Sequence, residues 1–426
     1  MRDVLSRFRQ AVDVTLQQVW AAPPPFALRA SSSLADDFLA PAIALTAGGK
    51  RTRALFALAG FQTGLEASPA TFSEIPTAEL PVYLGASLEL YQLSALIHDD
   101  VIDAAATRRG IATAHEAYAA WHTEHHLLGS REDFGEKMAI LLGDYVLSLA
   151  AYVLEQGLAS DPLLRPEAAN KVRELFHSMC TEVAFGQYTD ALSEFQPLES
   201  NSAAAIDQAL SVLYHKAARY SVSVPTLLGA ELAMARRRPH HCATVNIPST
   251  PTPQNDALTD TTTPNRAGSE STLVPHSPLH EHLTGSMNAY LPRDVSILAE
   301  LERICQPLGE AFQLRDDALG IFGDPQTTGK PAGGDLSEGK RTVLLALTRA
   351  AAPPHERAMI DALIGRPLSE EDLTTARTII RDCGAYDQHE AMIAEREAAV
   401  TTQMGTSRLE LSVLEQLADD LTQRTY

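Results

Sequence analysis

The chain has 426 residues, of which 45% are hydrophobic and 21% are charged, as in a globular protein with ample material for a core. Its formal net charge of -20 argues against nucleic acid and against a basic membrane-binding surface, because both need positive charge on the protein. The cysteines are widely spaced and show no CxxC or zinc-type pattern, so we expect free thiols in a reducing compartment.

Two stretches of the chain bear on its location. Residues 1–20 are polar and charged at helical spacing, and they lack the apolar core of a secretory signal. The apolar stretch 138–154 is interrupted by Asp144 and is short for a bilayer span. We therefore expect a cytoplasmic protein without a transmembrane segment.

Helical periodicity runs through most of the chain, and the alternating β-branched runs typical of strands are scarce. The expected helices cover residues 3–20, 35–45, 50–64, 79–103, 136–156, 166–195, 203–218, 221–236, 295–321, 340–350, 355–364, 369–382 and 387–422. Pro and Gly separate them, and no alternation of strands and helices is present. The pattern predicts an all-α helical bundle that forms a single domain over residues 1–426.

The first candidate functional motif is the sequence GGKRTR at residues 48–53. It opens an expected helix, where backbone amides together with Lys and Arg side chains form a natural anion site. An exposed basic turn is the alternative interpretation. A nucleotide-binding P-loop is rejected, because the spacing differs and no strand precedes the motif.

The second motif, DDVID at residues 99–103, ends a strongly apolar helix. Asp99 and Asp103 are i and i+4 neighbours on one helical face, near enough to share metal ions. Carboxylates at an apolar helix end are costly unless they are compensated, and Mg²⁺ is a common compensation. Arg108 and Arg109 follow, and their guanidinium groups could bind a phosphate beside the metal.

Two further features lie in the middle of the chain. Lys216 follows Tyr214 and His215 in an otherwise apolar helix, where a solitary Lys is usually a surface residue. Residues 237–283 are rich in Pro, Thr, Ser and Asn, which predicts a disordered insertion. We interpret it as a loop within one domain, because functional motifs lie on both sides of it.

A second acidic patch, RDDALG at residues 315–320, ends another apolar helix. Acidic and basic residues then alternate around glycine-rich turns, namely Asp316, Asp317, Asp324, Lys330, Asp335 and Lys340. This pattern suits a metal–diphosphate site closed by a loop, although a solvated charged loop is the alternative. The two patches together predict facing acidic walls with metal ions and a diphosphate between them.

These motifs, in this order and at these intervals, resemble those of the trans-type isoprenyl (polyprenyl) diphosphate synthases, and geranylgeranyl diphosphate synthases in particular. The likeness runs from about Gly48 to Thr342 and resumes after the insertion. It implies the all-α isoprenoid synthase fold, a helical bundle around a deep central cavity. It also implies a Mg²⁺-dependent, homodimeric enzyme that acts on isopentenyl diphosphate and allylic prenyl diphosphates.

The resemblance assigns roles to individual residues. The metal ligands would be Asp99, Asp103 and Asp316, supported by Asp100, Asp317 and Asp335. The allylic diphosphate would be bound by Arg108, Lys216, Lys330 and Lys340. The diphosphate of isopentenyl diphosphate would be bound by Lys50, Arg53, Gln92 and Arg109. Gln313 would line the reacting centre.

Ionising an allylic C–O bond requires stabilisation of a diphosphate leaving group, which Mg²⁺, Arg and Lys provide electrostatically. No Ser, Cys or His nucleophile is needed, in agreement with the absence of a recognisable triad. Two departures from the family pattern stand out. Gly320 replaces the usual third Asp of the second patch, for which Asp324 or Asp335 could compensate, and Ala217 replaces a usual Thr.

The resemblance also implies that bulky side chains before the first patch form a floor that limits product length. The residues four and five positions before Asp99 are Ala95 and Ser94, which are both small. Tyr91 lies about one helical turn deeper, roughly 5.4 Å, which corresponds to one further isoprene unit. We predict a C20 product, geranylgeranyl diphosphate, with C25 and farnesyl diphosphate as alternatives. A pure core role for Tyr91 is the other interpretation.

Two rival functions remain open at this point. A class I terpene cyclase also ionises a prenyl diphosphate, but it would not need the basic residues at 49–53 and Arg109. A non-catalytic regulatory subunit would agree with Gly320 and Ala217, yet both acidic walls and every cationic residue are present.

Overall fold

The computed structural model describes residues 1–22, 32–66, 79–162, 164, 166–237, 292–323 and 332–422. Within this part of the chain the structure consists of long helices and one short β-hairpin, which confirms the predicted all-α class. The predicted insertion lies outside the described residues except for Arg237, and so do Asp324 and Lys330.

The elements of the first half are α1 (Arg2–Ala21), α2 (Ser32–Thr46), α3 (Thr52–Leu65), α5 (Glu79–Ile102), β1 (Thr107–Arg108), β2 (Ile111–Ala112), α6 (Ala114–Glu124), α7 (Arg131–Ser160) and α8 (Pro166–Phe195). Those of the second half are α9 (Ser202–Val212), η2 (Leu213–Ser223), α10 (Val224–Arg237), α12 (Pro292–Phe322), α14 (Gly334–Glu338), α15 (Val343–Ala351), α16 (Pro354–Asp361), α17 (Glu370–Asp382), α18 (Ala385–Thr406) and α19 (Ser412–Thr422).

Local sequence signals explain several helix ends. The side chain of Ser130 accepts a hydrogen bond from the amide of Asp133 at the start of α7. Ser369 and Asp372 form a capping box at the start of α17, and Asn201 caps α9. These side chains satisfy backbone amides that the first turn of a helix leaves without partners.

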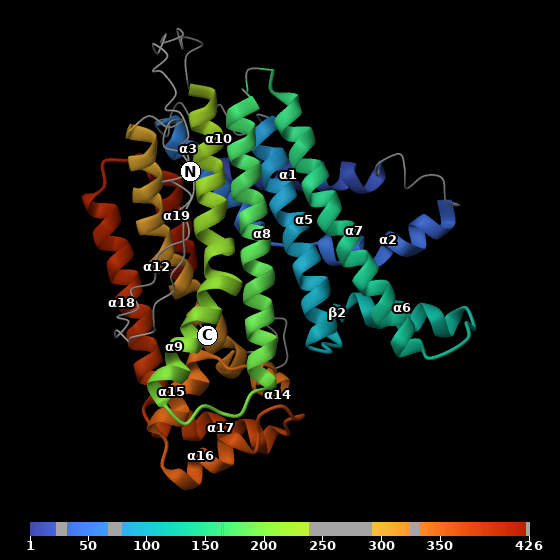
Figure 1. Cartoon of the computed structure of the whole chain (residues 1–426), viewed down its shortest axis with the longest axis vertical. Helices are drawn as coiled ribbons and strands as arrows, with labels where there is room; N and C mark the ends of the chain where they lie inside the picture. Colours follow the sequence, from blue (N-terminus) through green and yellow to red (C-terminus); the bar gives the residue numbers. More distant parts are fainter. Residues whose placement is uncertain are drawn as a thin grey trace, which may run out of the picture.

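The long helices α5, α7, α8 and α10 run along the length of the molecule, and α14 to α17 gather at one end (Figure 1). Helices α3 and α10 pack backbone to backbone through glycines on both sides. A Cβ at Gly60 would overlap the carbonyl of Thr226, and a Cβ at Gly229 would overlap the carbonyl of Ala57. This close approach explains why glycines are present within two buried helices.

The buried apolar residues form two clusters. The larger cluster joins α1, α3, α5, α7, α8, α10 and α19 with the first part of α12. The smaller one joins α9, α14 to α18 and the last part of α12. The η2 and α12 helices contribute to both clusters, so polar residues on them lie where the two cores meet.

The chain from Ser202 to Arg237 is one continuous helical run whose central part, η2, is a π-helix. The amide of Val224 donates to the carbonyl of Arg219, five residues back. Pro225 follows directly and has no amide hydrogen to donate, and wide turns of this kind are common beside such a residue. The predicted break between residues 218 and 221 was therefore wrong.

Other elements also differ from expectation. Helix α6 and the β1–β2 hairpin, in which Thr107 pairs with Ala112 and Arg108 with Ile111, were not predicted. The helix expected over residues 387–422 is divided into α18 and α19.

Two helices are long and apolar enough to cross a membrane by length and composition alone, within 80–102 and 131–160. The first is 72% buried and the second 44% buried in their apolar windows. Core helices of folded proteins pass the same test, so the finding is weak evidence for a span.

Candidate active site

A cavity of about 570 Å³ opens where α3, α5, α8, η2 and α12 converge. Most of the residues predicted for the site line this single cavity, although they lie far apart in sequence. They are Lys50, Arg53, Gln92, Asp99, Arg108, Arg109, Lys216, Gln313, Asp316, Asp317, Asp335 and Lys340. Asp99 and Asp316, from α5 and α12, therefore share one cleft.

The first acidic wall is the group Asp99, Asp100 and Asp103 at the end of α5. Asp100 is fully buried and binds Arg108, whose Nε donates to both carboxylate oxygens at 2.8 and 3.1 Å. A second guanidinium nitrogen of Arg108 lies 3.6 Å from Asp99 Oδ2. Asp100 thus fixes Arg108 beside Asp99, as expected of a supporting residue.

Two lysines complete the first wall. Lys216 Nζ lies 3.3 Å from Asp99 Oδ1 and 2.5 Å from Asp190 Oδ2. Lys340 Nζ lies 2.6 Å from Asp103 Oδ2 and also pairs with Glu338. The lysine on η2 thus contacts Asp99 and the lysine after α14 contacts Asp103, so each outer carboxylate of the wall has its own lysine.

The positive charges affect the two outer carboxylates differently. Burial disfavours the charged form of Asp99, but Lys216 and Lys340 outweigh it and lower its pKa to about 2. Burial and the neighbouring charge of Asp99 raise the pKa of Asp103 to about 6. A further cation at this wall would favour ionisation of both carboxylates.

Sequence reasoning missed two residues of α8 that belong to this wall. Asp190 is buried and binds Lys216, and Gln187 Nε2 donates to Asp99 Oδ1 at 3.0 Å. The two residues are three positions apart in the middle of a long helix, so they lie on one helical face. Nothing in the local sequence around them marks either residue as part of the site.

The second acidic wall is the group Asp316, Asp317 and Asp335. Gln313 Nε2 donates to Asp317 Oδ1 at 3.1 Å, one turn along α12. Burial, then the charges of Asp335 and Asp316, hold the pKa of Asp317 well above its usual range. The protonated form of Asp317 is therefore favoured unless a cation offsets the charge of its carboxylate.

Gly320 contributes to this wall because its missing side chain leaves room for a neighbouring carboxylate. A Cβ at Gly320 would overlap the carboxylate of Asp335. The carboxylate of Asp335 thus lies beside the position where the family pattern has a third Asp. This placement agrees with the expectation that Asp335 could compensate, whereas Asp324 lies outside the described residues.

The opposite side of the cavity is a cationic pole, defined here as Lys50, Arg51, Arg53 and Arg109. Burial, then the charge of Arg108, lowers the pKa of Arg109. The buried side chain of Glu89 accepts a hydrogen bond from the amide of Ala54 at 3.2 Å. Burial raises the pKa of Glu89, and the positive charges of Arg53 and Arg51 oppose that shift.

Arg51, to which the sequence assigned no role, is the structural member of this pole. It is 8% exposed, and it donates to Asp13 Oδ1 and to the carbonyl of Thr46, both at 2.7 Å. Arg51 and Arg109 both adopt a left-handed backbone, with φ of 55° and 53°. Strained backbone of this kind concentrates at functional sites.

The predicted floor residues lie behind the cavity rather than among the residues that line it. The ring of Tyr91 contacts the rings of Phe176 and Tyr220 edge-on, with centroids 6.1 and 6.2 Å apart. Ser94 donates to the carbonyl of Gly143 at 2.8 Å and so faces α7. Tyr220 lines the cavity where Tyr91, Ser94 and Ala95 do not.

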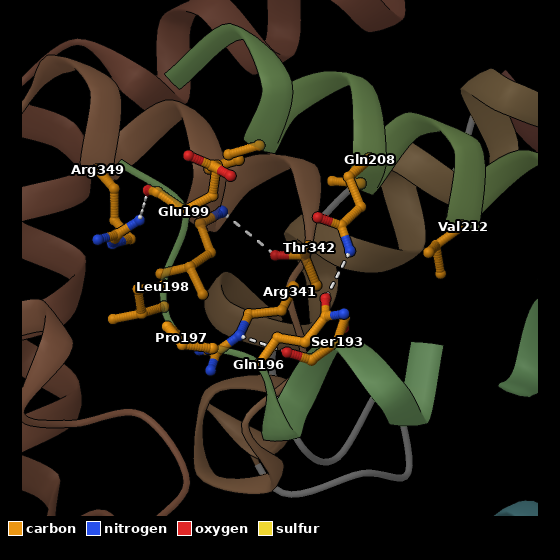
Figure 2. A pocket seen from close by; sticks show the side chains of 14 residues that line it. Ser193, Gln196, Pro197, Leu198, Glu199, Gln208, Val212, Arg341, Thr342 and Arg349 are labelled. Carbon is orange, nitrogen blue, oxygen red and sulfur yellow. Dashed lines mark hydrogen bonds between the residues drawn. The ribbon is translucent and has the colours of Figure 1, made fainter. Parts of the chain in front are cut away.

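A smaller pocket lies beside the cavity, between the end of α8, the following loop and α15 (Figure 2). Arg341 lines both spaces and donates to the carbonyls of Ser193 and Glu194 at 3.4 and 3.3 Å. Arg349 binds the carbonyl of Glu199 at 2.9 Å. These contacts attach the end of α8 to the segment that carries Lys340.

The oxygen donors of the first wall determine which kind of metal site it could form. Mg²⁺ takes oxygen ligands and binds through one or two carboxylates plus substrate phosphates. Across the described ranges no group of three acidic, histidine or cysteine side chains is gathered closely enough to hold a metal by itself. The residues therefore fit a cation bound jointly by Asp99 or Asp103 and a diphosphate, rather than a closed cage.

A family model described as "Polyprenyl synthetase" matches residues 37–247 and 282–380. Geranylfarnesyl diphosphate synthase of Aeropyrum pernix is 30% identical over 356 residues, which cover 82% of this chain and 80% of that protein. Geranylgeranyl diphosphate synthase of Mycobacterium tuberculosis is 28% identical, with 69% and 60% covered.

Solved structures agree with these relatives. Geranylgeranyl pyrophosphate synthase from Corynebacterium glutamicum, in complex with isoprenyl diphosphate and magnesium, superposes with a TM-score of 0.71 at 30% identity. The alignment covers 100% of this chain and 98% of that one. The fold is thus the predicted isoprenoid synthase fold. The chain belongs to the polyprenyl synthetase family, and it is an isoprenyl diphosphate synthase.

Proposed function

We propose that this prenyltransferase condenses isopentenyl diphosphate with an allylic prenyl diphosphate in a Mg²⁺-dependent reaction, and that its main product is geranylgeranyl diphosphate. The observation that carries the proposal is a single cavity lined by two groups of cationic residues, each of which would suit a diphosphate. Acidic walls with Arg108, Lys216 and Lys340 form one region, and the cationic pole forms the other. A cyclase would need only the first.

The cationic pole supplies direct support for a second anion. Arg53 lines the cavity, and its buried Nε has no hydrogen-bond partner among the described residues. An unsatisfied donor of a charged group is costly, and a phosphate oxygen would satisfy it. Arg109, crowded by other guanidinium groups, would gain from the same negative charge.

The acidic walls would serve the first chemical step. Bound Mg²⁺ would supply positive charge to the leaving diphosphate. Arg108, Lys216 and Lys340 would bind its oxygens as the allylic C–O bond breaks and the electron pair leaves with the diphosphate. Asp100 and Asp190 would keep two of these cations in position, because each binds one of them directly.

The cationic pole would serve the second step. Lys50, Arg53 and Gln92 would orient isopentenyl diphosphate so that its double bond faces the allylic cation. The electron pair of that double bond forms the new C–C bond. A proton is then lost to the departed diphosphate, which restores a neutral alkene.

The test is to incubate the purified chain with Mg²⁺, farnesyl diphosphate and isopentenyl diphosphate, and to identify the products by chromatography. Elongation supports the proposal. A cyclised hydrocarbon would identify a terpene cyclase instead, and no product with any allylic starter would identify a non-catalytic subunit.

The product length is supported by the aromatic residues behind the cavity. Relatives include synthases named for geranylgeranyl, geranylfarnesyl and nonaprenyl diphosphate, so the family alone leaves the length open. Tyr91 packs edge-on against Phe176 and Tyr220, and Tyr220 lines the cavity, so we take this aromatic group as the floor. Tyr91→Ala should therefore shift the products beyond C20, and an unchanged product length would refute the floor.

The homodimer and the cytoplasmic location are proposals as well. Helices α7 and α8 each leave large apolar side chains exposed, among them Leu141 and Tyr152 on α7 and Phe185 and Tyr188 on α8. Exposed apolar surface of this kind suits a second copy of the chain. Light scattering on the purified chain tests the dimer, and cell fractionation tests the location.

A further inference from the structure

The cationic pole is supported by two adjacent residues of η2 to which no role was assigned. The hydroxyl of Tyr220 donates to Oε1 of Gln92 at 2.5 Å. The guanidinium carbon of Arg53 lies 4.1 Å from the centroid of the Tyr220 ring. Arg53 also donates from a terminal nitrogen to Ser221 Oγ at 2.7 Å. Tyr220 and Ser221 thus contact two side chains that would bind one diphosphate.

The contact with Gln92 sets which end of its carboxamide is available. A glutamine side chain carries an acceptor oxygen and a donor NH₂ group, and only the donor can bind a phosphate oxygen. Because the hydroxyl of Tyr220 occupies Oε1, the NH₂ group is the end left for a ligand. Without that hydroxyl the carboxamide could rotate and present its oxygen to the diphosphate, which would repel it.

The contacts with Arg53 restrain a long and otherwise mobile side chain. The aromatic ring of Tyr220 attracts the guanidinium group through a cation–π interaction, and Ser221 fixes one of its nitrogens. Both residues are nearly fully buried, so these contacts are rigid supports. The Nε of Arg53 stays without a hydrogen-bond partner among the described residues.

We propose that Tyr220 and Ser221 are positioning residues that hold Gln92 and Arg53 in the orientation that binds isopentenyl diphosphate. The inference rests on the proposed function, because it assigns that substrate to the cationic pole. Lys216, one turn away on η2, contacts the first acidic wall instead. Changes at Tyr220 that preserve its ring should therefore weaken the binding of isopentenyl diphosphate and leave the binding of the allylic diphosphate unchanged.

The experiment begins with steady-state kinetics of Tyr220→Phe, which removes only the hydroxyl. The KM for isopentenyl diphosphate should rise about 3- to 10-fold, which corresponds to the free energy of one lost hydrogen bond. The KM for the allylic diphosphate and kcat should change less than about 2-fold, since the allylic site is untouched. Ser221→Ala should raise the same KM by about 3-fold through Arg53.

A double-mutant cycle identifies the residue through which Tyr220 acts. In a Gln92→Ala background the carboxamide is absent, so Tyr220→Phe should no longer change the KM for isopentenyl diphosphate. Tyr118→Phe is the matched control. Tyr118 is a buried residue of α6 whose hydroxyl donates to the carbonyl of Phe38, outside the cavity. Its loss should leave both KM values unchanged.

The outcomes separate the two proposals. A wild-type chain that elongates, with Tyr220→Phe leaving the KM unchanged, overturns this inference alone. An equal effect of Tyr220→Phe with and without Gln92 also overturns it. A wild-type chain that elongates no allylic diphosphate removes the proposed function and this inference together. If Tyr220→Phe fails to fold by circular dichroism, an unchanged KM in Ser221→Ala overturns the inference.

Discussion

The two acidic walls of the cavity are built from the same residue type at the ends of two long helices, yet their electrostatic surroundings differ. In the first wall Arg108 and Lys216 lie beside Asp99, whose pKa falls to about 2. In the second wall burial and neighbouring acids hold the pKa of Asp317 well above its usual range. Ionisation is thus favoured at Asp99 and disfavoured at Asp317, as it also is at Asp100 and Asp103 beside Asp99.

The difference indicates which cations would favour the ionised carboxylates in each wall. At Asp99 the cations Lys216, Lys340 and Arg108 already favour the ionised carboxylate, and the same cations would also attract an incoming diphosphate. In the second wall burial and neighbouring acids favour the protonated form of Asp317, and a bound divalent cation would favour its ionised form. We infer that the first wall is largely preformed and that the second depends more strongly on the metal.

The largest expected effect comes from removing one carboxylate from either wall. Asp99→Asn and Asp316→Asn should each lower kcat by about 10³-fold, the scale on which enzymes lose preorganised charge stabilisation. If the walls differ as argued, the two variants should differ in metal dependence. Calorimetric titration with inorganic pyrophosphate at several Mg²⁺ concentrations measures this difference.

In that titration Asp99→Asn should raise the Mg²⁺ requirement only slightly, because the lost metal ligand is partly offset when Arg108 and Lys216 lose a competing anion. Asp316→Asn should need more Mg²⁺. Equal metal dependence in both variants would contradict the comparison, even if both lost activity.

The second effect concerns the space beside Gly320. Gly320→Ala places a methyl group where the carboxylate of Asp335 lies, so Asp335 must move. We expect the Mg²⁺ concentration for half-maximal activity to rise about 10- to 100-fold, with the KM for isopentenyl diphosphate unchanged. Metal-dependent thermal stabilisation by pyrophosphate provides a readout that does not require turnover.

Gly405→Ala is the matched control for this substitution. Gly405 lies in α18, and a Cβ there would meet no atom within 4 Å. Alanine in a helix is favoured over glycine by about 1 kcal/mol, so this variant should be slightly more stable with normal metal dependence. A similar response of both variants would show that the Gly320 effect is unrelated to Asp335.

The parts of the site that the sequence predicted are those with a local signature. Asp99 and Asp103 are marked by i, i+4 spacing at an apolar helix end, and GGKRTR by basic residues at a helix start. Asp190 has no such mark, because its function arises from Lys216, which reaches it from another helix. Pairings of this kind depend on tertiary packing and leave no pattern in either segment.

The fold shows the same limit. Apolar periodicity predicted the long helices, because the residues of a buried helical face recur at regular spacing in the sequence. It failed at residues 218–221, where Arg219, Tyr220 and Ser221 look like a polar break but are buried inside a π-helix. Tyr220 and Ser221 hydrogen-bond to side chains of α5 and α3, and Arg219 forms an ion pair with Glu182 of α8, contacts that the local sequence does not reveal.

The smallest effect is a pH dependence of stability behind the second wall. His389 lies on α18, which packs along α12, and its ring is fully buried with neither nitrogen hydrogen-bonded within the described residues. Burial lowers the pKa of His389 to about 4, with Arg315 and Arg396 adding to that shift and Glu390 opposing it.

The unfolded chain, with a pKa of 6.5, therefore binds a proton that the folded protein excludes between pH 6.5 and 4. Folding stability from this group is complete above pH 6.5 and should fall by roughly 1 kcal/mol between pH 7.5 and 5.5. Urea unfolding at both pH values measures the loss. His389→Leu should reduce it, whereas the exposed His355→Gln should not. If His389→Leu keeps the pH dependence of the wild type, another group causes the loss of stability at low pH.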